Sequence, residues 1–204
     1  IRKLVRIHQA DETRHAALFA DAASMASATI PQLPEHLLLL ERLDSAFGGF
    51  FAQFQAGERG VMDLYLLLQV IEERATTQFR MMEPELRRFD PESADMLLTI
   101  AADEDRHLKY CRAIAKKYAP SDAIREQTLA EIRRVEAQVF GEHSRDNMEH
   151  CLDQGLLDIP AFEMPIWRAL LRFGKKSNMP VPSAFWSAPS PLQARWQRVV
   201  ARAA

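Results

Sequence analysis

The chain has 204 residues, of which 48% are hydrophobic, and its formal net charge is -2. This length is sufficient for a buried hydrophobic core in one domain, with or without an extension. The near-neutral charge gives no electrostatic reason to expect a nucleic acid or a membrane surface as a partner. The longest apolar runs, such as residues 37–40 and 64–68, are far shorter than a membrane span, so the sequence predicts a soluble protein.

The two cysteines, Cys111 and Cys151, are too few for a disulfide-stabilised scaffold. Free thiols are typical of a reducing compartment, so the sequence favours a cytoplasmic protein.

The first helix is predicted over residues 1 to about 28, where apolar and polar residues recur three and four positions apart. Pro31 and Pro34 end it. No capping residue precedes its apolar pattern. We therefore expect that the natural protein has additional residues before residue 1 and that these form a further helix. The predicted inner face of the first helix consists of Ile1, Leu4, Val5, His8, Glu12, His15, Phe19 and Ala22.

A connecting region with a short helix over residues 35–43 leads to a second long helix, predicted over residues 61–88. Pro84 is expected to bend this helix or to break it near its end. One face of the helix carries Val61, Leu64, Leu68, Glu72, Ala75, Phe79 and Met82.

Asp90 followed by Pro91 predicts the start of a third long helix, through about residue 117. Ser121 can cap a fourth, over residues 122–154, and prolines limit any later helix to short pieces. Nothing predicts a run of strands, so the fold class is all-α. We expect a helical bundle over residues 1–120 and a helical, proline-rich C-terminal extension over residues 121–204. The inner face of the third long helix carries Leu97, Ile100, Ala101, Glu104, His107, Cys111 and Ile114.

Two hexapeptides nearly repeat. Residues 10–15 read Ala-Asp-Glu-Thr-Arg-His, and residues 102–107 read Ala-Asp-Glu-Asp-Arg-His. A Glu and a His three positions apart point the same way on a helix, so each hexapeptide can offer a carboxylate and an imidazole to one metal ion. A single Glu-x-x-His is common on solvated helices, but two copies on apolar stripes would leave buried carboxylates uncompensated without a cation. The repeat therefore predicts a two-metal site.

Paired Asp-Glu-x-Arg-His helices with an intervening Glu resemble the ferritin-like di-iron-carboxylate superfamily, over residues 1 to about 118. Its members place Glu, Glu-x-x-His, Glu and Glu-x-x-His on four consecutive helices. The resemblance implies a ferritin-like bundle holding two metal ions, expected to be iron, with manganese or a mixed Mn/Fe pair as the alternatives. Carried over residue by residue, the pattern assigns as metal ligands Glu12, His15, Glu104 and His107.

The third-helix carboxylate of this pattern falls to Glu72 or Glu73. We prefer Glu72, because it shares the apolar face of its helix. The first-helix Glu has no counterpart, and we expect it in sequence that precedes residue 1. Glu136, seven residues before His143 on one helix face, is the internal alternative.

Three residues beside these ligands are predicted to support the site. Asp11 and Asp103 each precede a ligand Glu and can accept hydrogen bonds from imidazole N–H groups, which would fix the ring orientation. The alternative is that each is a solvent-facing acid paired with a neighbouring arginine, Arg14 or Arg106. His8, one turn before Glu12, is interpreted as a core or outer-layer histidine. The alternative for His8 is an extra metal ligand, as in ferritin-like N-oxygenases, although their extra histidine accompanies the other Glu-x-x-His helix.

Several residues have packing as their default interpretation: Cys111 as a small buried hydrophobe, and Tyr65 and Tyr110 as core tyrosines, with electron relay as an alternative. The aromatic residues of the tail allow two interpretations, cover for the bundle or a homodimer contact. They are Trp167, Phe173, Phe185, Trp186 and Trp196.

The hypothesis for function is a di-iron oxidase or monooxygenase that uses O2 on a small organic substrate. The additional segments over residues 31–60 and 122–204 suit a substrate pocket. No Cys-x-x-Cys pair is present, so a separate electron donor is expected. The segment 71–75 is also similar to a stretch of a bacterial di-iron hydroxylase that modifies tRNA, but the chain lacks a basic patch. The alternatives are iron handling or peroxide defence without an organic substrate, and a scaffold without catalytic use.

Overall fold

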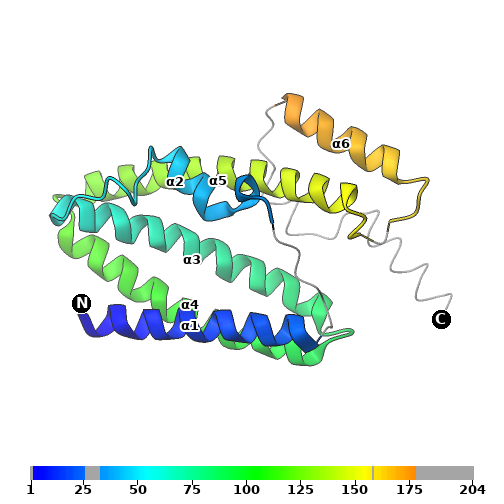
Figure 1. Cartoon of the computed structure of the whole chain (residues 1–204). Coiled ribbons are helices and arrows are strands. Elements are labelled where there is room, and N and C mark those ends of the chain that lie inside the picture. Colours follow the sequence, from blue (N-terminus) through cyan, green and yellow to red (C-terminus); the bar gives the residue numbers. More distant parts are fainter. Residues whose placement is uncertain (1, 26–32, 158, 178–204) are drawn as a thin grey trace. The chain divides into compact units, whose positions relative to one another are not determined.

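The structure is a computed structural model that describes residues 2–25, 33–157 and 159–177 (Figure 1). These residues form α-helices and one short 3-10 helix and contain no strand, which confirms the all-α class. None of the described helices has the length and hydropathy needed to cross a membrane. The predictions for the chain beyond residue 177, including Phe185, Trp186 and Trp196, lie outside the described residues. The elements are α1 (Arg2–Met25), η1 (Glu35–Leu37), α2 (Leu39–Ala46), α3 (Glu58–Leu86), α4 (Pro91–Tyr118), α5 (Asp122–Asp153) and α6 (Met164–Ser177).

The predicted start signals of α4 and α5 are present in the structure. The Asp90 carboxylate accepts a hydrogen bond from the Ser93 backbone N–H at 3.0 Å, and Pro91 opens α4 where no donor is lost. The Ser121 hydroxyl accepts one from the N–H of Ile124 at 3.2 Å, just before α5. Both long helices therefore begin at the residues that the sequence indicates.

Several boundaries differ from the prediction. Helix α3, expected over residues 61–88, runs from Glu58 to Leu86 and continues through Pro84. The short helix expected over residues 35–43 is divided into η1 and α2, and α2 continues to Ala46. Gly48 and Gly49, with φ of 71° and 80°, then turn the chain. Helix α6 has 14 residues, longer than the short pieces that the prolines predicted, because Pro165 lies in its first turn, where proline is tolerated.

The chain divides into two compact units, residues 1–136 and 137–204, and the boundary falls inside α5. In the first unit α3 and α4 are neighbours that run in opposite directions, joined by a short turn (Figure 1). The beginning of α5 contributes Leu129 and Ile132 to the same hydrophobic core. Cys111 is fully buried there, and this agrees with its interpretation as a small hydrophobe. In the second unit, Arg168 of α6 pairs with Asp153 at 3.0 Å.

Helix α1 runs antiparallel to α4 and parallel to α3. His15 of α1 lies beside Asp103 of α4, whereas His8 lies beside the later residue Tyr110. Phe19 of α1 contacts Phe79 of α3, with ring centroids 6.1 Å apart. These contacts place polar side chains of α1 against α4 and the aromatic ring of Phe19 against α3.

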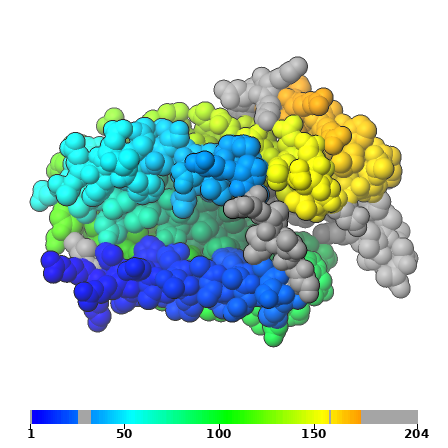
Figure 2. Space-filling model, in the orientation of Figure 1, coloured from blue at the N-terminus to red at the C-terminus, as the bar shows by residue number. Residues whose placement is uncertain are grey.

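Much of α1 lies at the surface (Figure 2). The apolar stripe predicted to face the core is buried only in part, since Leu4, Val5 and Phe19 are 37%, 44% and 42% exposed. Asp11 and His15 are the buried side chains of this helix. Helix α1 is therefore attached to the described core mainly through its polar residues.

Candidate metal centre

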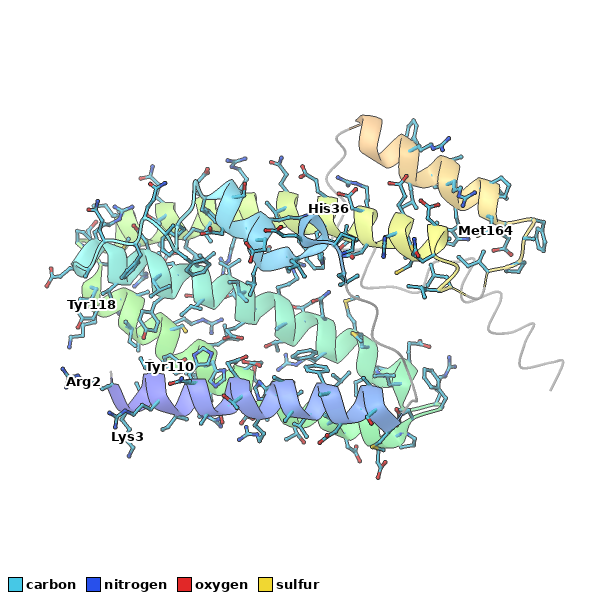
Figure 3. The ribbon with its side chains drawn as sticks, viewed as in Figure 1. Arg2, Lys3, His36, Tyr110, Tyr118 and Met164 are labelled. Atoms are coloured by element: carbon cyan, nitrogen blue, oxygen red, sulfur yellow. The ribbon has the colours of Figure 1, made fainter. Side chains whose placement is uncertain are left out.

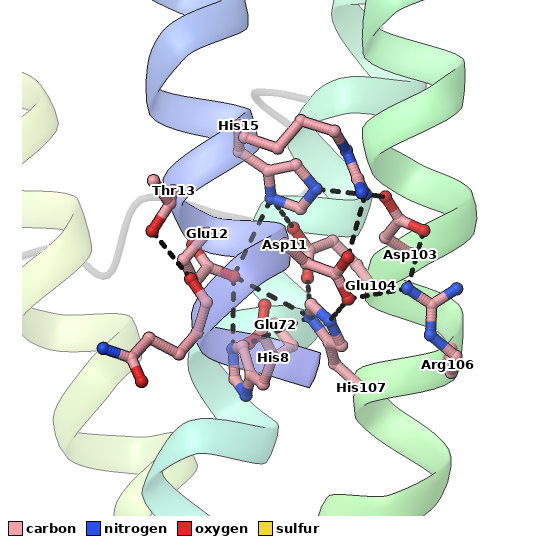
Figure 4. A network of polar contacts seen from close by, with 12 residues as sticks. His8, Asp11, Glu12, Thr13, His15, Glu72, Asp103, Glu104, Arg106 and His107 are labelled. Atoms are coloured by element: carbon pink, nitrogen blue, oxygen red, sulfur yellow. Dashed lines mark hydrogen bonds and ion pairs between the residues drawn. The ribbon is translucent and has the colours of Figure 1, made fainter. Parts of the chain in front are cut away.

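Six histidine and glutamate side chains from three helices converge between α1, α3 and α4 (Figure 4). They form two groups in which potential ligand atoms all lie within 4.8 Å of one another, and Glu12 belongs to both. The first group is His8, Glu12, Glu72 and His107, and the second is Glu12, His15 and Glu104.

The spacing along each helix explains why these residues meet. His8, Glu12 and His15 are four and three positions apart on α1, and Glu104 and His107 are three apart on α4. Each set therefore projects from one side of its helix. All five ligands assigned by the sequence pattern lie in the cluster, together with His8.

Glu104 lies between two histidines. Its Oε1 is 3.3 Å from Nδ1 of His15, and its Oε2 is 2.7 Å from Nδ1 of His107. Oε1 of Glu12 is 3.8 Å from the same nitrogen of each of these histidines. Both carboxylates therefore lie near His15 and His107 at once.

Glu72 lies at one end of the cluster. Its Oε1 is 3.3 Å from Nε2 of His8 and 3.9 Å from Nδ1 of His107. Glu73 points elsewhere and forms ion pairs with Arg133 at 2.9 Å and Arg112 at 3.1 Å. Of the two glutamates weighed from the sequence, Glu72 is the one that the structure brings to the cluster.

The aspartate of each hexapeptide contacts the histidine of the other hexapeptide, on the facing helix. Oδ2 of Asp11 on α1 lies 3.0 Å from Nε2 of His107 on α4, and Oδ2 of Asp103 on α4 lies 3.2 Å from Nε2 of His15 on α1. The two arginines of the repeat also contact these aspartates. Arg106 donates to both, at 2.7 and 2.8 Å, and Arg14 forms ion pairs with both. Each aspartate thus contacts both an imidazole and an arginine, but neither faces solvent, since their side chains are 7% and 13% exposed.

His8 is closer to the carboxylates than the sequence interpretation placed it. Its Nε2 lies 3.1 Å from Oε1 of Glu12, and its ring stacks on His107 with centroids 4.0 Å apart. Its Nδ1 forms a hydrogen bond with the Tyr110 hydroxyl. The sequence analysis did not identify Tyr110 as a supporting residue, although its position three residues after His107 was a signal.

The electrostatics of the site follow from its crowded charges. Burial lowers the pKa of His8, but its hydrogen bonds with Glu12 and Glu72 outweigh burial and raise this pKa to about 9. Burial raises the pKa of Glu72, and the neighbouring Glu104 raises it further. Burial also raises the pKa of Asp11, but hydrogen bonds from His107 and Arg106 outweigh it and lower this pKa to about 2. The metal-free site therefore favours a protonated His8 and an ionised Asp11.

The cluster is buried except at two residues. The Glu12 and His8 side chains are 51% and 15% exposed, whereas those of Glu72, Glu104 and His107 are at most 8% exposed. Glu12 is therefore the member of the cluster most open to solvent.

The donor set could hold a metal ion. Two of its three carboxylates, those of Glu72 and Glu104, are buried, and buried carboxylates are costly unless cations or hydrogen bonds compensate them. Carboxylate oxygens with imidazole nitrogens suit iron or manganese, and each histidine has a hydrogen-bonding group behind it, as metal-bound histidines do. Glu136, the internal alternative for a further carboxylate, belongs to neither group and instead accepts two hydrogen bonds from Arg74, at 2.8 and 2.9 Å.

A separate pocket of about 500 Å³ lies on another side of α3. None of its lining residues belongs to the histidine and glutamate cluster. The Phe47 and Phe50 side chains contribute to its wall. Its lining also includes Arg59, Asp63, Leu67, Ile124, Gln127, Thr128, Glu131 and Ile132.

No protein-family model, no curated protein and no solved structure matches this chain.

Proposed function

We propose that this protein binds two metal ions, iron in the first instance, and uses them with O2 to oxidise a small organic substrate. The observation that carries the proposal is the largely buried cluster of three histidines and three glutamates, in which Glu12 belongs to both ligand groups and Glu104 faces both His15 and His107. A reduced iron pair supplies electrons to O2 when it is bound at such a site.

The side chains of this protein would hold, orient and shield that pair. Glu72, His15 and His107 would fix the metals from α3, α1 and α4, together with Glu12 and Glu104. Asp11 and Asp103 would hold the rings of His107 and His15 in the orientation that aims Nδ1 at the carboxylates. The exposed side of Glu12 would admit O2 and substrate.

The arrangement of helices supports a ferritin-like fold as part of the proposal. Ferritin-like bundles contain one long crossover connection between helices. Here the segment between α1 and α3 connects two helices that run parallel, and α4 returns antiparallel to both. In that interpretation α1, α3 and α4 correspond to the second, third and fourth bundle helices.

Oxygen consumption by the iron-loaded protein tests the proposed activity. Protein loaded with Fe(II) without oxygen is mixed with O2, and oxygen uptake and iron oxidation are recorded. We expect both to proceed much faster than with free Fe(II) and to saturate at about two iron ions per chain. Glu104→Ala should abolish this phase, whereas the exposed control Glu131→Ala should retain it.

The same assay distinguishes substrate oxidation from the alternative function, iron handling without an organic substrate. Continued iron oxidation far beyond two ions per chain, without any organic substrate, would favour iron handling over substrate oxidation. Uptake no faster than that of free Fe(II) would remove the oxidase hypothesis altogether.

A further inference from the structure

Each of the three clustered histidines has one ring nitrogen facing the carboxylates and the other facing an outer hydrogen-bonding group. His107 directs Nδ1 to Glu104 and Nε2 to Asp11. His15 directs Nδ1 to Glu104, at 3.3 Å, and Nε2 to Asp103. A metal-bound histidine has this arrangement, since its free N–H donates to an oxygen that fixes the ring.

His8 has the same arrangement with its two nitrogens exchanged. Its Nε2 faces Glu12 at 3.1 Å and Glu72 at 3.3 Å, and its Nδ1 meets the Tyr110 hydroxyl. Tyr110 lies on α4, close to α1 (Figure 3). The side chain of His8 is 15% exposed, so water does not readily replace these contacts.

Resting on the proposed metal centre, we infer that His8 is a third histidine ligand, bound through Nε2, and that it makes the two metal positions unequal. The first position has His8, His107 and Glu72, with the shared carboxylate Glu12. The second position has His15 and Glu104, with the same shared carboxylate.

The difference in ligands predicts a difference in affinity. Among the described residues, the first position has two imidazoles and one carboxylate of its own, whereas the second has one imidazole and one carboxylate of its own. A site with a full set of protein ligands is closed, and one with fewer keeps room for an outside ligand. The first position therefore fills first and holds its ion tightly. The second fills later, exchanges its ion and is the place where an outside ligand binds.

The ordinary alternative is a histidine satisfied by ion pairs within the core. In that case His8 would remain a hydrogen-bonding neighbour of Glu12 and Glu72 when metal is present. Its nitrogens would then not contact the metal, and the two positions would each have one histidine.

Nitrogen NMR of the zinc-loaded protein distinguishes these two arrangements. Zinc is diamagnetic, and the imidazole nitrogen that binds it changes its chemical shift. The chain has six histidines, which are assigned with single His→Gln variants. With the first equivalent of zinc we expect bound-type shifts at Nε2 of His8 and Nδ1 of His107, and with the second at Nδ1 of His15.

A binding titration with His8→Gln gives a second test. Loss of a ligand should weaken the tight step by about 100-fold or more, since removal of an outer hydrogen-bonding group alone costs about 10- to 100-fold. The matched control is His36→Gln, an exposed histidine on η1 (Figure 3). Far-UV circular dichroism checks that both variants fold, and the NMR experiment on the wild-type protein needs no variant that lacks His8.

Three outcomes decide the matter. Bound-type shifts at three histidines, together with a weakened tight step in His8→Gln, support the inference. Shifts at His15 and His107 alone overturn it while leaving the metal centre intact. If none of the histidines binds zinc, both the inference and the proposed function are wrong.

Discussion

Asp11 on α1 accepts a hydrogen bond from His107 on α4, with 3.0 Å between Oδ2 and Nε2. In the corresponding pair, Asp103 on α4 and His15 on α1, Oδ2 and Nε2 are 3.2 Å apart. The repeated Asp-Glu-x-Arg-His produces this crossing because its two copies lie on antiparallel helices that face each other at the cluster. Each helix therefore supplies both a ligand pair and the group that orients the histidine of the other helix.

The first prediction concerns these aspartates. Asp11→Asn weakens the hydrogen bond to His107 and should lower zinc affinity by about 10- to 100-fold, measured by competition with a chelator of known affinity. Asp103→Asn should act in the same way through His15.

The matched control for both variants is Asp105→Asn, on the same helix as Asp103. Asp105 is half exposed and pairs with Arg80 outside the cluster, so its substitution should leave zinc affinity unchanged. Equal affinities for all four proteins would show that the crossed hydrogen bonds do not support metal binding.

The second prediction concerns acid stability of the metal-free protein. The pKa of Asp11 falls from 3.8 to about 2 on folding, although burial opposes the shift, because His107 and Arg106 donate hydrogen bonds to its carboxylate. Between these values the unfolded chain binds the proton and the folded chain does not. The stabilisation is therefore complete above about pH 4 and is lost as the pH falls towards 2.

Urea unfolding at a series of pH values between 2 and 5 measures this effect. The free energy of unfolding should fall less steeply with acid in Asp11→Asn than in the wild-type protein. Parallel pH profiles for the two proteins would contradict the assignment of this acid sensitivity to Asp11.

The third prediction tests the packing of α4. Leu97 is 1% exposed and its neighbour Leu98 is 45% exposed. Leu97→Ala should lower the free energy of unfolding by about 2–5 kcal/mol, because it leaves a cavity. Leu98→Ala should change it by less than about 0.5 kcal/mol, as surface substitutions do. Denaturant unfolding compares them, and equal losses would contradict the orientation of α4.

The fourth prediction separates a structural carboxylate from a metal ligand. Glu136 is buried and paired with Arg74 through two hydrogen bonds. Glu136→Ala should lower the free energy of unfolding by about 1–3 kcal/mol, since it removes the acceptor of a part-buried arginine. The amount of zinc bound by the folded variant should stay equal to that of the wild-type protein. A loss of bound zinc without a loss of stability would assign Glu136 to the metal centre.

The sequence predicted the helices well because their end signals are local. Asp90 with Pro91, and Ser121, act within one turn of the helix that they start, so no distant contact is needed to identify them. The length of α6 was underestimated, because proline was counted as a breaker at a first-turn position, where it is tolerated.

The candidate site was predicted in part for a related reason. Spacing along one helix places Glu12 beside His15, and Glu104 beside His107, whatever the remainder of the fold. The role of His8 depends instead on which nitrogen faces the carboxylates, and this orientation follows from Tyr110 on another helix, 102 residues away in sequence. A sequence pattern cannot specify a ring orientation that is set by a distant side chain.

The most direct test of the central claim is equilibrium dialysis of the wild-type protein and Glu104→Ala against Fe(II) without oxygen, followed by elemental analysis. Two overlapping ligand groups predict about two iron ions per wild-type chain and a marked loss in the variant, because Glu104 faces both His15 and His107. Iron no higher in the folded wild-type protein than in the variant would contradict the proposed metal centre.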